Sequence, residues 1–508
     1  MVGFVMVVVA VILGGVQTAE AADAGAADGR DAIAQAGAQR RARHPKAASL
    51  TAAGVLSGDP DDALARAAMV ELALALDALG HREAARLVFH DVLAGDMDPA
   101  SVRALRHLVA WDPSTVDVDL AALVANLPVN GSPVSLQGPL HRLQGVDHVH
   151  AGRLAEARAA LQDTDDPQSR LMQALVEVEQ GLPKTGAFHL IQVAGGPDAT
   201  ATRDLARLNL ARWLVGQDRL ADAAAIWASI DPSRPDWARA REEQAWAWLR
   251  MGETGRALGN VLALESARGQ AELTVEAPLI AGVAYAEACR WDVAAAVATA
   301  LQDDLTPQVH ELQTWLADAR PETAVWDWFG PGPRPTVVSE AVFRSAFRDQ
   351  RLSSLMLRRR ALQAEAAALA SSTGPRGWDR LSGELQGRIA AERERVETAA
   401  GEALMAGLQA EVDRMQRAIA SAAVLAFEAS DGQRRELEAL ARTGGATPTG
   451  DALIDYAVSE DIIMWPFNGE FWEDELDAYA VDVQRACPAP RDLSLAPVRR
   501  EVPRTGLF

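Results

Sequence analysis

Cysteine, lysine and aromatic side chains are scarce in this chain, and so are alternating runs of Val, Ile and Thr. Only 5% of the residues are aromatic, and lysine occurs only at Lys46 and Lys184. Without apolar runs of period two, strands are not expected, whereas the abundance of Ala, Leu, Arg and Glu favours helix. We therefore predict an all-α protein in which arginine carries nearly all of the positive charge.

Net positive charge and catalytic motifs are lacking as well. The net charge is -21, and no extended basic face is present, which argues against a nucleic-acid partner. The sequence contains no phosphate-binding glycine loop, no nucleophile elbow, no His-Glu-x-x-His and no Cys-x-x-Cys. His141, His148 and His150 come closest to a metal cluster, but on a helix the last two point about 200° apart. We expect no catalytic residue, no metal, no cofactor and no enzymatic activity.

The only two cysteines are Cys289 and Cys487. In an exported protein, such a pair can form one disulfide, which here would tie the end of the repeat region to the C-terminal segment. The alternative is a buried thiol in a helix and an unrelated thiol near the C-terminus. Neither cysteine has the ligand spacing of a zinc site.

An apolar run at residues 2–16 has the length of a signal peptide, and residues 19–21 have the small-x-small pattern of a cleavage site. The run is too short for a comfortable membrane span, and it lacks the basic residues that usually precede such a run. We predict a signal peptide over 1–21 and a periplasmic or secreted protein, with a retained weak anchor as the alternative. Residues 22–58, which lack an apolar period, are predicted to be a disordered lead-in.

A ladder of small residues set in helical runs such as GRLAEARAAL is the most informative pattern. Successive rungs are 72, 66, 34 and 37 residues apart, so a unit of about 34 residues recurs, with two degenerate copies between the clearer ones. Repeats of this length are typical of helical hairpins that bury their apolar faces against their neighbours. We predict about seven hairpins over 59–320, stacked into a right-handed solenoid. The rungs are Ala85, Ala157, Ala223, Ala257 and Ala294.

Residues 279–294, LIAGVAYAEACRWDVA, resemble a tetratricopeptide repeat. Gly282 allows close helix approach, Trp291 packs after the turn, and Ala294 sits at the crossing of the second helix. The resemblance implies a concave surface, formed by the first helix of each hairpin, that binds proteins or peptides. Within it, an aromatic residue and an arginine one turn apart, Trp246 and Arg250, are the expected hot spot. The implied groove residues are Arg212, Arg239, Glu242, Trp246, Arg250 and Glu287.

A Pro- and Gly-rich stretch predicts a linker over 321–336 that ends the repeat region. Residues 337–445 are predicted to form an antiparallel coiled-coil hairpin, which also allows self-association, because apolar residues of its second helix recur at gaps of three and four. An arginine run at 358–360 is interpreted as a solvated face. The apolar seam consists of Leu404, Leu408, Val412, Met415, Ile419, Ala422 and Ala426.

An aromatic-rich segment at 450–487 precedes a tail over 488–508 that is predicted to be disordered. We predict a short helix in this segment, with its aromatic face buried against the helical pair or the last hairpin; a partner protein is the alternative. The run WPFNGEFWEDEL and the element ACRWDVA are similar to exported repeat proteins of predatory and gliding delta-type bacteria. The aromatic docking residues are Trp465, Phe467, Phe471 and Trp472.

These patterns together predict a non-enzymatic, protein-binding scaffold of the bacterial cell envelope, whose groove holds partner proteins or peptides. The similarity to exported delta-type proteins implies a place in an envelope or motility-type complex. The alternative is an accessory factor or cryptic enzyme of cell-wall or polysaccharide processing.

Overall fold

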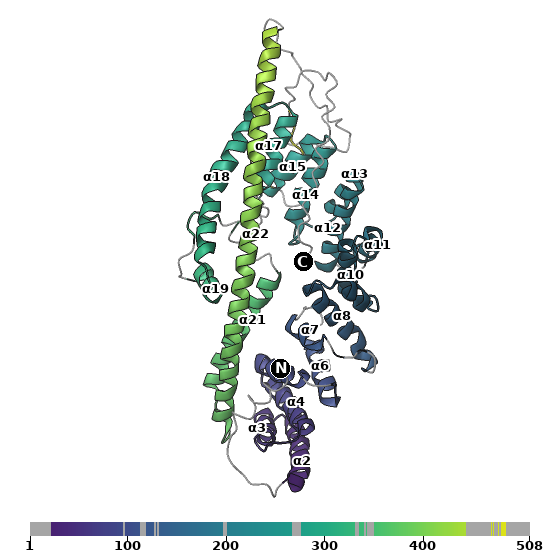
Figure 1. Ribbon diagram of the computed structural model, residues 1–508, viewed down its shortest axis with the longest axis vertical. Helices are drawn as coiled ribbons and strands as arrows, with labels where there is room; N and C mark the ends of the chain where they lie inside the picture. Colours follow the sequence, from purple (N-terminus) through teal and green to yellow (C-terminus); the bar gives the residue numbers. More distant parts are fainter. Residues whose placement is uncertain are drawn as a thin grey trace. The chain divides into compact units, whose positions relative to one another are not determined.

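The computed structural model is helical, with no strand among the residues that it describes (Figure 1). The predicted signal peptide over 1–21 and the predicted tail over 488–508 lie outside these residues. None of the described helices is long and apolar enough to cross a lipid bilayer. The described residues are 22–94, 97–111, 118–125, 127, 129, 132–196, 201–266, 276–330, 335–339, 342, 350–442, 469, 471, 476 and 479–483.

The chain forms two compact units, and each unit combines parts of the chain that are distant in sequence. Unit 1 comprises Met1–Val176 with Ser354–Ala399, and unit 2 comprises Glu177–Ser353 with Ala400–Phe508. This division differs from the predicted boundaries, which separate a repeat region over 59–320 from a helical pair over 337–445.

Unit 1 contains a series of helices from the N-terminal half of the chain and most of one later helix, α21. Its helices are α2 (Ala22–Arg41), α3 (Pro45–Leu56), α4 (Asp62–Ala78), α5 (Arg82–Leu93), α6 (Pro99–Trp111), α7 (Val118–Val124), α8 (Val134–His150), α9 (Leu154–Leu161), most of α10 (Pro167–Glu179) and most of α21 (Gln350–Ser371).

Unit 2 continues the series, and a single long helix, α22 (Trp378–Arg442), belongs to unit 1 in its first part and to unit 2 in its second. The other helices of unit 2 are α11 (Pro183–Ala194), α12 (Ala201–Gly216), α13 (Leu220–Ala228), α14 (Trp237–Arg250), α15 (Thr254–Leu264), α17 (Ala277–Glu287), α18 (Trp291–Asp318) and α19 (Pro321–Phe329). The prediction of a linker over 321–336 is therefore wrong for 321–329, where α19 forms because its apolar residues are buried.

Seven pairs of successive helices in the described chain are joined by turns of one geometry. In each turn a residue with φ between +56° and +85° follows the first helix, and the next residue, with ψ between 53° and 69°, begins the second. That next residue donates its N–H to the carbonyl five positions earlier, as His81 does to Leu76 (2.9 Å), which closes the first helix. The left-handed residues are Arg43, Gly80, Gly152, Gly181, Asp218, Gly252 and Cys289.

The five predicted rungs of the ladder are all fully buried, and each lies five residues after the left-handed residue of its turn. This position is in the first turn of the second helix, where a small side chain lets two helices approach closely. Ala48 and Gly186 hold the same position in α3 and α11 and are buried as well. The ladder therefore has two further rungs, Ala48 and Gly186.

The prediction of a disordered lead-in over 22–58 is wrong. Helices α2 and α3 occupy this region and form the first hairpin, in which Ala36, Ala48 and Ala52 are fully buried. Alanine contacts between closely approaching helices need no large apolar residues. For this reason the segment lacks the strong apolar period that signals a packed helix.

The predicted helical pair is present only in part. Helix α21 begins at Gln350, and residues 336–339 are not helical. The chain turns at residues 372–377, after which α22 returns alongside α21, with Arg359 paired to Glu397 at 2.9 Å. Because α21 is much shorter than α22, it reaches only the first part of the long helix.

In unit 2 the long helix α22 packs against the repeat helices. Leu404, Leu408 and Val412 are fully buried there, as the seam predicts. A Cβ placed on Gly282 of α17 would lie 2.5 Å from the side chain of Leu425, and one on Gly432 of α22 would lie 2.7 Å from the ring of Trp291. The pattern thus identified the buried side of α22 from Leu404 to Met415 and at Ala422. It is wrong at Ile419 and Ala426, which are half-buried, whereas Ala418 and Leu425 are buried.

Candidate functional site

One strip of α14 faces outward, while most of the helix is buried. The residues of this strip lie at positions i, i+4, i+7 and i+11, which share one helix face. The positions between them are buried apart from Trp248. The α14 strip consists of Arg239, Glu243, Trp246 and Arg250.

Side chains of the α14 strip contact the hairpins on both sides. Arg212 of α12 donates from Nε to both carboxylate oxygens of Glu243 at 2.9 and 3.1 Å. Trp246 donates from Nε1 to Glu276, the residue before α17, at 3.2 Å. Arg250 donates to Asp218, the left-handed residue of the α12–α13 turn, at 2.9 Å.

The same type of contact recurs in the N-terminal hairpins. Arg40 and Arg103 both pair with the buried carboxylate of Glu71, at 3.2 and 2.7 Å, and His107 contacts Asp77 at 2.9 Å. Partners in these contacts are 30 to 32 residues apart, close to one repeat. A search of the sequence for complementary polar pairs at this separation would have found them.

Four of the six predicted groove residues therefore lie together. Arg212 and the strip residues Arg239, Trp246 and Arg250 share one surface of unit 2. Glu242 is buried, so its prediction as a groove residue is wrong; it is adjacent in sequence to Glu243, which takes its place. Glu287 is exposed at the end of α17, the first helix of the next hairpin, and precedes the left-handed residue of its turn by two positions, as Arg250 does.

Charges are dense at the base of the strip. Burial lowers the pKa of the Arg239 guanidinium, and the neighbouring charge of Arg212 lowers it further, whereas the Glu243 carboxylate opposes the change. Burial also raises the pKa of the Asp236 carboxyl. The surface offers guanidinium, carboxylate and indole groups to a polar ligand.

The described residues contain no group of three or more His, Cys, Asp or Glu side chains arranged to hold a metal ion. Among the three histidines considered from the sequence, His148 accepts a hydrogen bond at Nδ1 from Arg153 at 3.0 Å.

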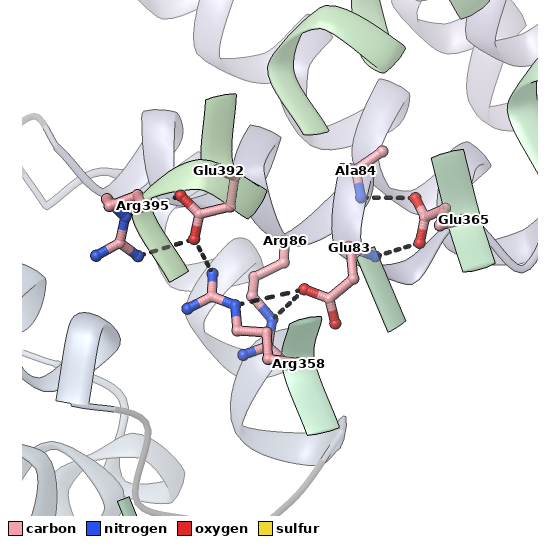
Figure 2. Close-up of polar contacts among 7 residues, drawn as sticks. All are labelled: Glu83, Ala84, Arg86, Arg358, Glu365, Glu392 and Arg395. Carbon is pink, nitrogen blue, oxygen red and sulfur yellow. Dashed lines mark hydrogen bonds and ion pairs between the residues drawn. The ribbon is translucent and has the colours of Figure 1, made fainter. Parts of the chain in front are cut away.

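A second polar site lies in unit 1, where α21 and α22 pack on the second helix of a hairpin, α5 (Figure 2). The carboxylate of Glu365 accepts hydrogen bonds from the backbone N–H groups of Glu83 and Ala84 at 2.7 and 2.8 Å. His81, the residue before α5, provides no side-chain cap. Burial raises the pKa of the Glu365 carboxyl, and the two backbone bonds oppose this. Glu365 thus caps α5 from a distant part of the chain.

Arg358 stands at the centre of this site, so its interpretation as part of a solvated face is wrong. Its side chain is only 11% exposed and forms an ion pair with Glu392 at 2.7 Å, while its Nε lies 3.6 Å from Glu83 (Figure 2). Arg395 contacts the same Glu392 carboxylate at 2.8 and 2.9 Å. A run of arginines does not show from sequence which member faces two carboxylates.

The turn between α21 and α22 is anchored on α3. Lys46 donates to Ser372 Oγ at 3.0 Å, and its ammonium lies 5.0 Å from the ring centroid of Trp378. Trp378 is fully buried, and its ring stacks at 6.4 Å on His81. Burial and the charge of Lys46 lower the pKa of His81. One of the two lysines of the chain thus joins the first hairpin to the later helices of unit 1.

A short part of the C-terminal segment packs on α15 in unit 2. The N–H of Val481 donates to the carbonyl of Gly255 at 2.9 Å. A Cβ at Gly259 would overlap the carbonyl oxygen of Tyr479, so the absence of a side chain makes this approach possible. Leu476 and Val483 are buried.

The described residues of 450–487 are not helical, so the prediction of a helix is wrong for Phe471 and for residues 479–483. The ring of Phe471 lies 6.3 Å from that of Tyr479. A backbone N–H that donates to another helix cannot also donate to the carbonyl four residues earlier in its own segment, as an α-helix requires. Trp465, Phe467 and Trp472 lie outside the described residues.

Cys289 is disulfide-bonded. It is the left-handed residue of the α17–α18 turn, with φ of 56°. The other cysteine of the sequence, Cys487, lies outside the described residues, so the pairing of Cys289 with Cys487 stays a prediction.

The surfaces of this chain are thus of two kinds. The first helix α14 presents a strip of charged and aromatic residues, and the second helices α5 and α15 carry other parts of the chain. Both kinds offer binding chemistry, and their residues are held by helices on either side. No protein-family model and no curated protein matches this chain.

Proposed function

We propose that the chain is a non-enzymatic, protein-binding scaffold of the bacterial cell envelope, built as a tetratricopeptide-like solenoid. Seven turns of one geometry, buried small residues at one register and contacts between successive hairpins support this architecture. Stacked hairpins create extended surfaces that suit proteins or peptides better than small molecules.

The observation that carries the proposal is the outward face of α14, where Trp246 and Arg250 lie one turn apart. The Arg250–Asp218 pair is open to solvent, with 47% and 82% of the two side chains exposed, so it contributes little to stability. A carboxylate of a partner replaces Asp218 at little cost. The indole of Trp246 supplies adjoining apolar area.

An envelope location is proposed from the apolar run at 2–16 and from the similarity of the C-terminal run to exported repeat proteins. A disulfide at Cys289 fits an oxidising compartment. A place in an envelope or motility-type complex follows from the same similarity.

Affinity capture from native envelope extracts tests the proposed surface. The variant with Trp246→Ala and Arg250→Ala is expected to lose its captured partners while keeping its helical circular dichroism. Arg219→Ala is the matched control, because it removes an exposed arginine paired with Asp222 at the start of a second helix, α13. Equal capture by the double variant and the control contradicts the proposal.

A further inference from the structure

The common turn geometry allows the second helices to be compared position by position. Their outer faces include the positions three and seven residues after the left-handed residue. In α5 these are Glu83, which contacts Arg358, and Leu87, whose carbonyl accepts from Arg388 at 3.4 Å. In α15 they are Gly255 and Gly259, on which the C-terminal segment lies.

Helix α3 follows the same rule. Lys46, three residues after Arg43, bonds the α21–α22 turn, and a Cβ on Gly377 of that turn would lie 3.6 Å from Leu50, seven residues after Arg43. The outer face is therefore a docking face, which the chain itself occupies on α3, α5 and α15.

Other second helices leave this face open. In α9 and α13 the two positions hold small, exposed residues, which need no cover. In α11 they hold Lys184 and Phe188, with Ile191 one turn further on. Phe188 is 57% exposed and Ile191 is 54% exposed. Two large apolar side chains on one helix face are seldom left this open to solvent. The alanines of α9 and α13 are Ala155, Ala159, Ala221 and Ala225.

The start of α11 matches the start of α5, the helix that Glu365 caps. Leu182, at the position of His81, provides no side-chain cap. Lys184 and Thr185 hold the positions of Glu83 and Ala84, and both are exposed. A carboxylate at this helix end would meet backbone N–H groups, the positive end of the helix dipole and the Lys184 ammonium.

We propose that the outer face of α11 binds an acidic amphipathic helix of a partner protein, in the manner in which α5 binds α21. A carboxylate of that helix caps the N–H groups of Lys184 and Thr185, and its apolar residues cover Phe188 and Ile191. The proposal rests on the proposed scaffold function but uses a different surface from the α14 strip.

Helix α21 supplies the pattern that such a partner needs. Around Glu365 it places Leu362 and Leu369, both buried almost completely, and Ala366, which is partly buried in the same core. The pattern is Leu-x-x-Glu-Ala-x-x-Leu. Its two leucines lie within one turn of the glutamate on either side, on the same face of the helix.

A fluorescein-labelled helical peptide carrying this pattern in an Ala- and Glu-rich background tests the proposal by fluorescence anisotropy with the full chain. Phe188→Ala with Ile191→Ala is expected to weaken binding by about tenfold or more, because both apolar contacts are lost. A peptide with Gln at the central Glu is expected to bind about fivefold more weakly, since it loses the charge at the helix end.

Val134→Ala is the matched control, because Val134 is 84% exposed on another helix, α8, and its loss should leave the affinity unchanged. Equal peptide affinity of the native chain and of the Phe188 and Ile191 double variant overturns the proposal. That result would also follow if the peptide bound α5 in place of α21. Equal affinity of the Glu and Gln peptides, or no binding at all, overturns the proposal as well. Because this assay leaves Trp246 and Arg250 intact, its failure is distinct from a failure of the capture experiment.

Discussion

Position 259 shows how one missing methyl group determines a contact at the residue scale. Gly259 is buried in α15, and the backbone of Tyr479 occupies the space that a side chain would take. The corresponding position in α13 is Ala225, which is exposed. Glycine at this position lowers helix stability slightly, but it allows the backbone of Tyr479 to lie directly against α15.

Gly259→Ala is expected to expel residues 479–483 from α15, because the new Cβ would overlap a backbone oxygen and neither backbone is easily moved. Hydrogen exchange should show loss of protection at Val481, whose N–H bonds Gly255. Gly407→Ala is the control, because no atom lies within 4 Å of a Cβ there, and alanine in a helix interior should stabilise by about 0.5–1 kcal/mol. Retained protection at Val481 in the Gly259 variant would show that the backbone of residues 479–483 can shift to accommodate the new methyl group.

At the residue scale, the sequence predicts burial correctly where the size of the side chain alone determines which residue fits between two helices. The ladder identified positions at which only small residues fit, and all five proved buried. It did not identify the turns, because Arg43, Asp218 and Cys289 take a left-handed conformation that glycine adopts elsewhere. Arginine and cysteine, unlike glycine or aspartate, give no sequence signal for this conformation.

At the scale of elements, the second helices share a weakness at their first turns. In none of the seven that follow the common turn does the side chain of the preceding residue cap the helix. The turn fixes the backbone of the preceding residue, and the residue type there varies from His to Leu to Glu. A carboxylate from elsewhere therefore finds open N–H groups, as Glu365 does on α5.

Glu365→Ala is expected to destabilise the packing of α21 on α5 by about 2 kcal/mol, because two buried N–H groups lose their acceptor. Hydrogen exchange should accelerate in the first turn of α5, and thermal unfolding should begin at a lower temperature. Glu394→Ala, which removes an exposed carboxylate of α22, is the control and should leave both measurements unchanged. Unaltered exchange in α5 would mean that water replaces the cap without penalty.

Element-scale patterns revealed which faces are buried but not what covers them. The seam of α22 was correct for Leu404 to Met415, but the helix meets α17 and α18 through Leu425 and Gly432, which lie outside the seam. Periodicity reports only that a face is apolar. The choice of partner depends on local fit, such as that of Gly282 and Leu425, which no pattern in one helix contains.

At the scale of the whole molecule, each unit joins repeat helices to a later part of the chain. Unit 1 needs α21 and the start of α22 to cover α3 and α5. Unit 2 needs the remainder of α22 and the C-terminal residues to cover α15 and α17. Contacts of such large sequence separation cost much chain entropy, which a covalent link offsets.

Cys289 provides such a link, and we predict Cys487 as its partner, because residues 479–483 already lie on α15, one hairpin before Cys289. Non-reducing peptide mapping should find the Cys289 and Cys487 peptides joined. Cys487→Ser should leave Cys289 as a thiol and lower the unfolding free energy by about 2–4 kcal/mol, since the closed loop is long. The hydrogen bond from Val481 to Gly255 should remain, so the N–H of Val481 should keep part of its protection from hydrogen exchange. Disulfide-linked dimers or two free thiols in the native protein would instead show that the backbone contacts of residues 479–483 alone hold the C-terminal segment on α15.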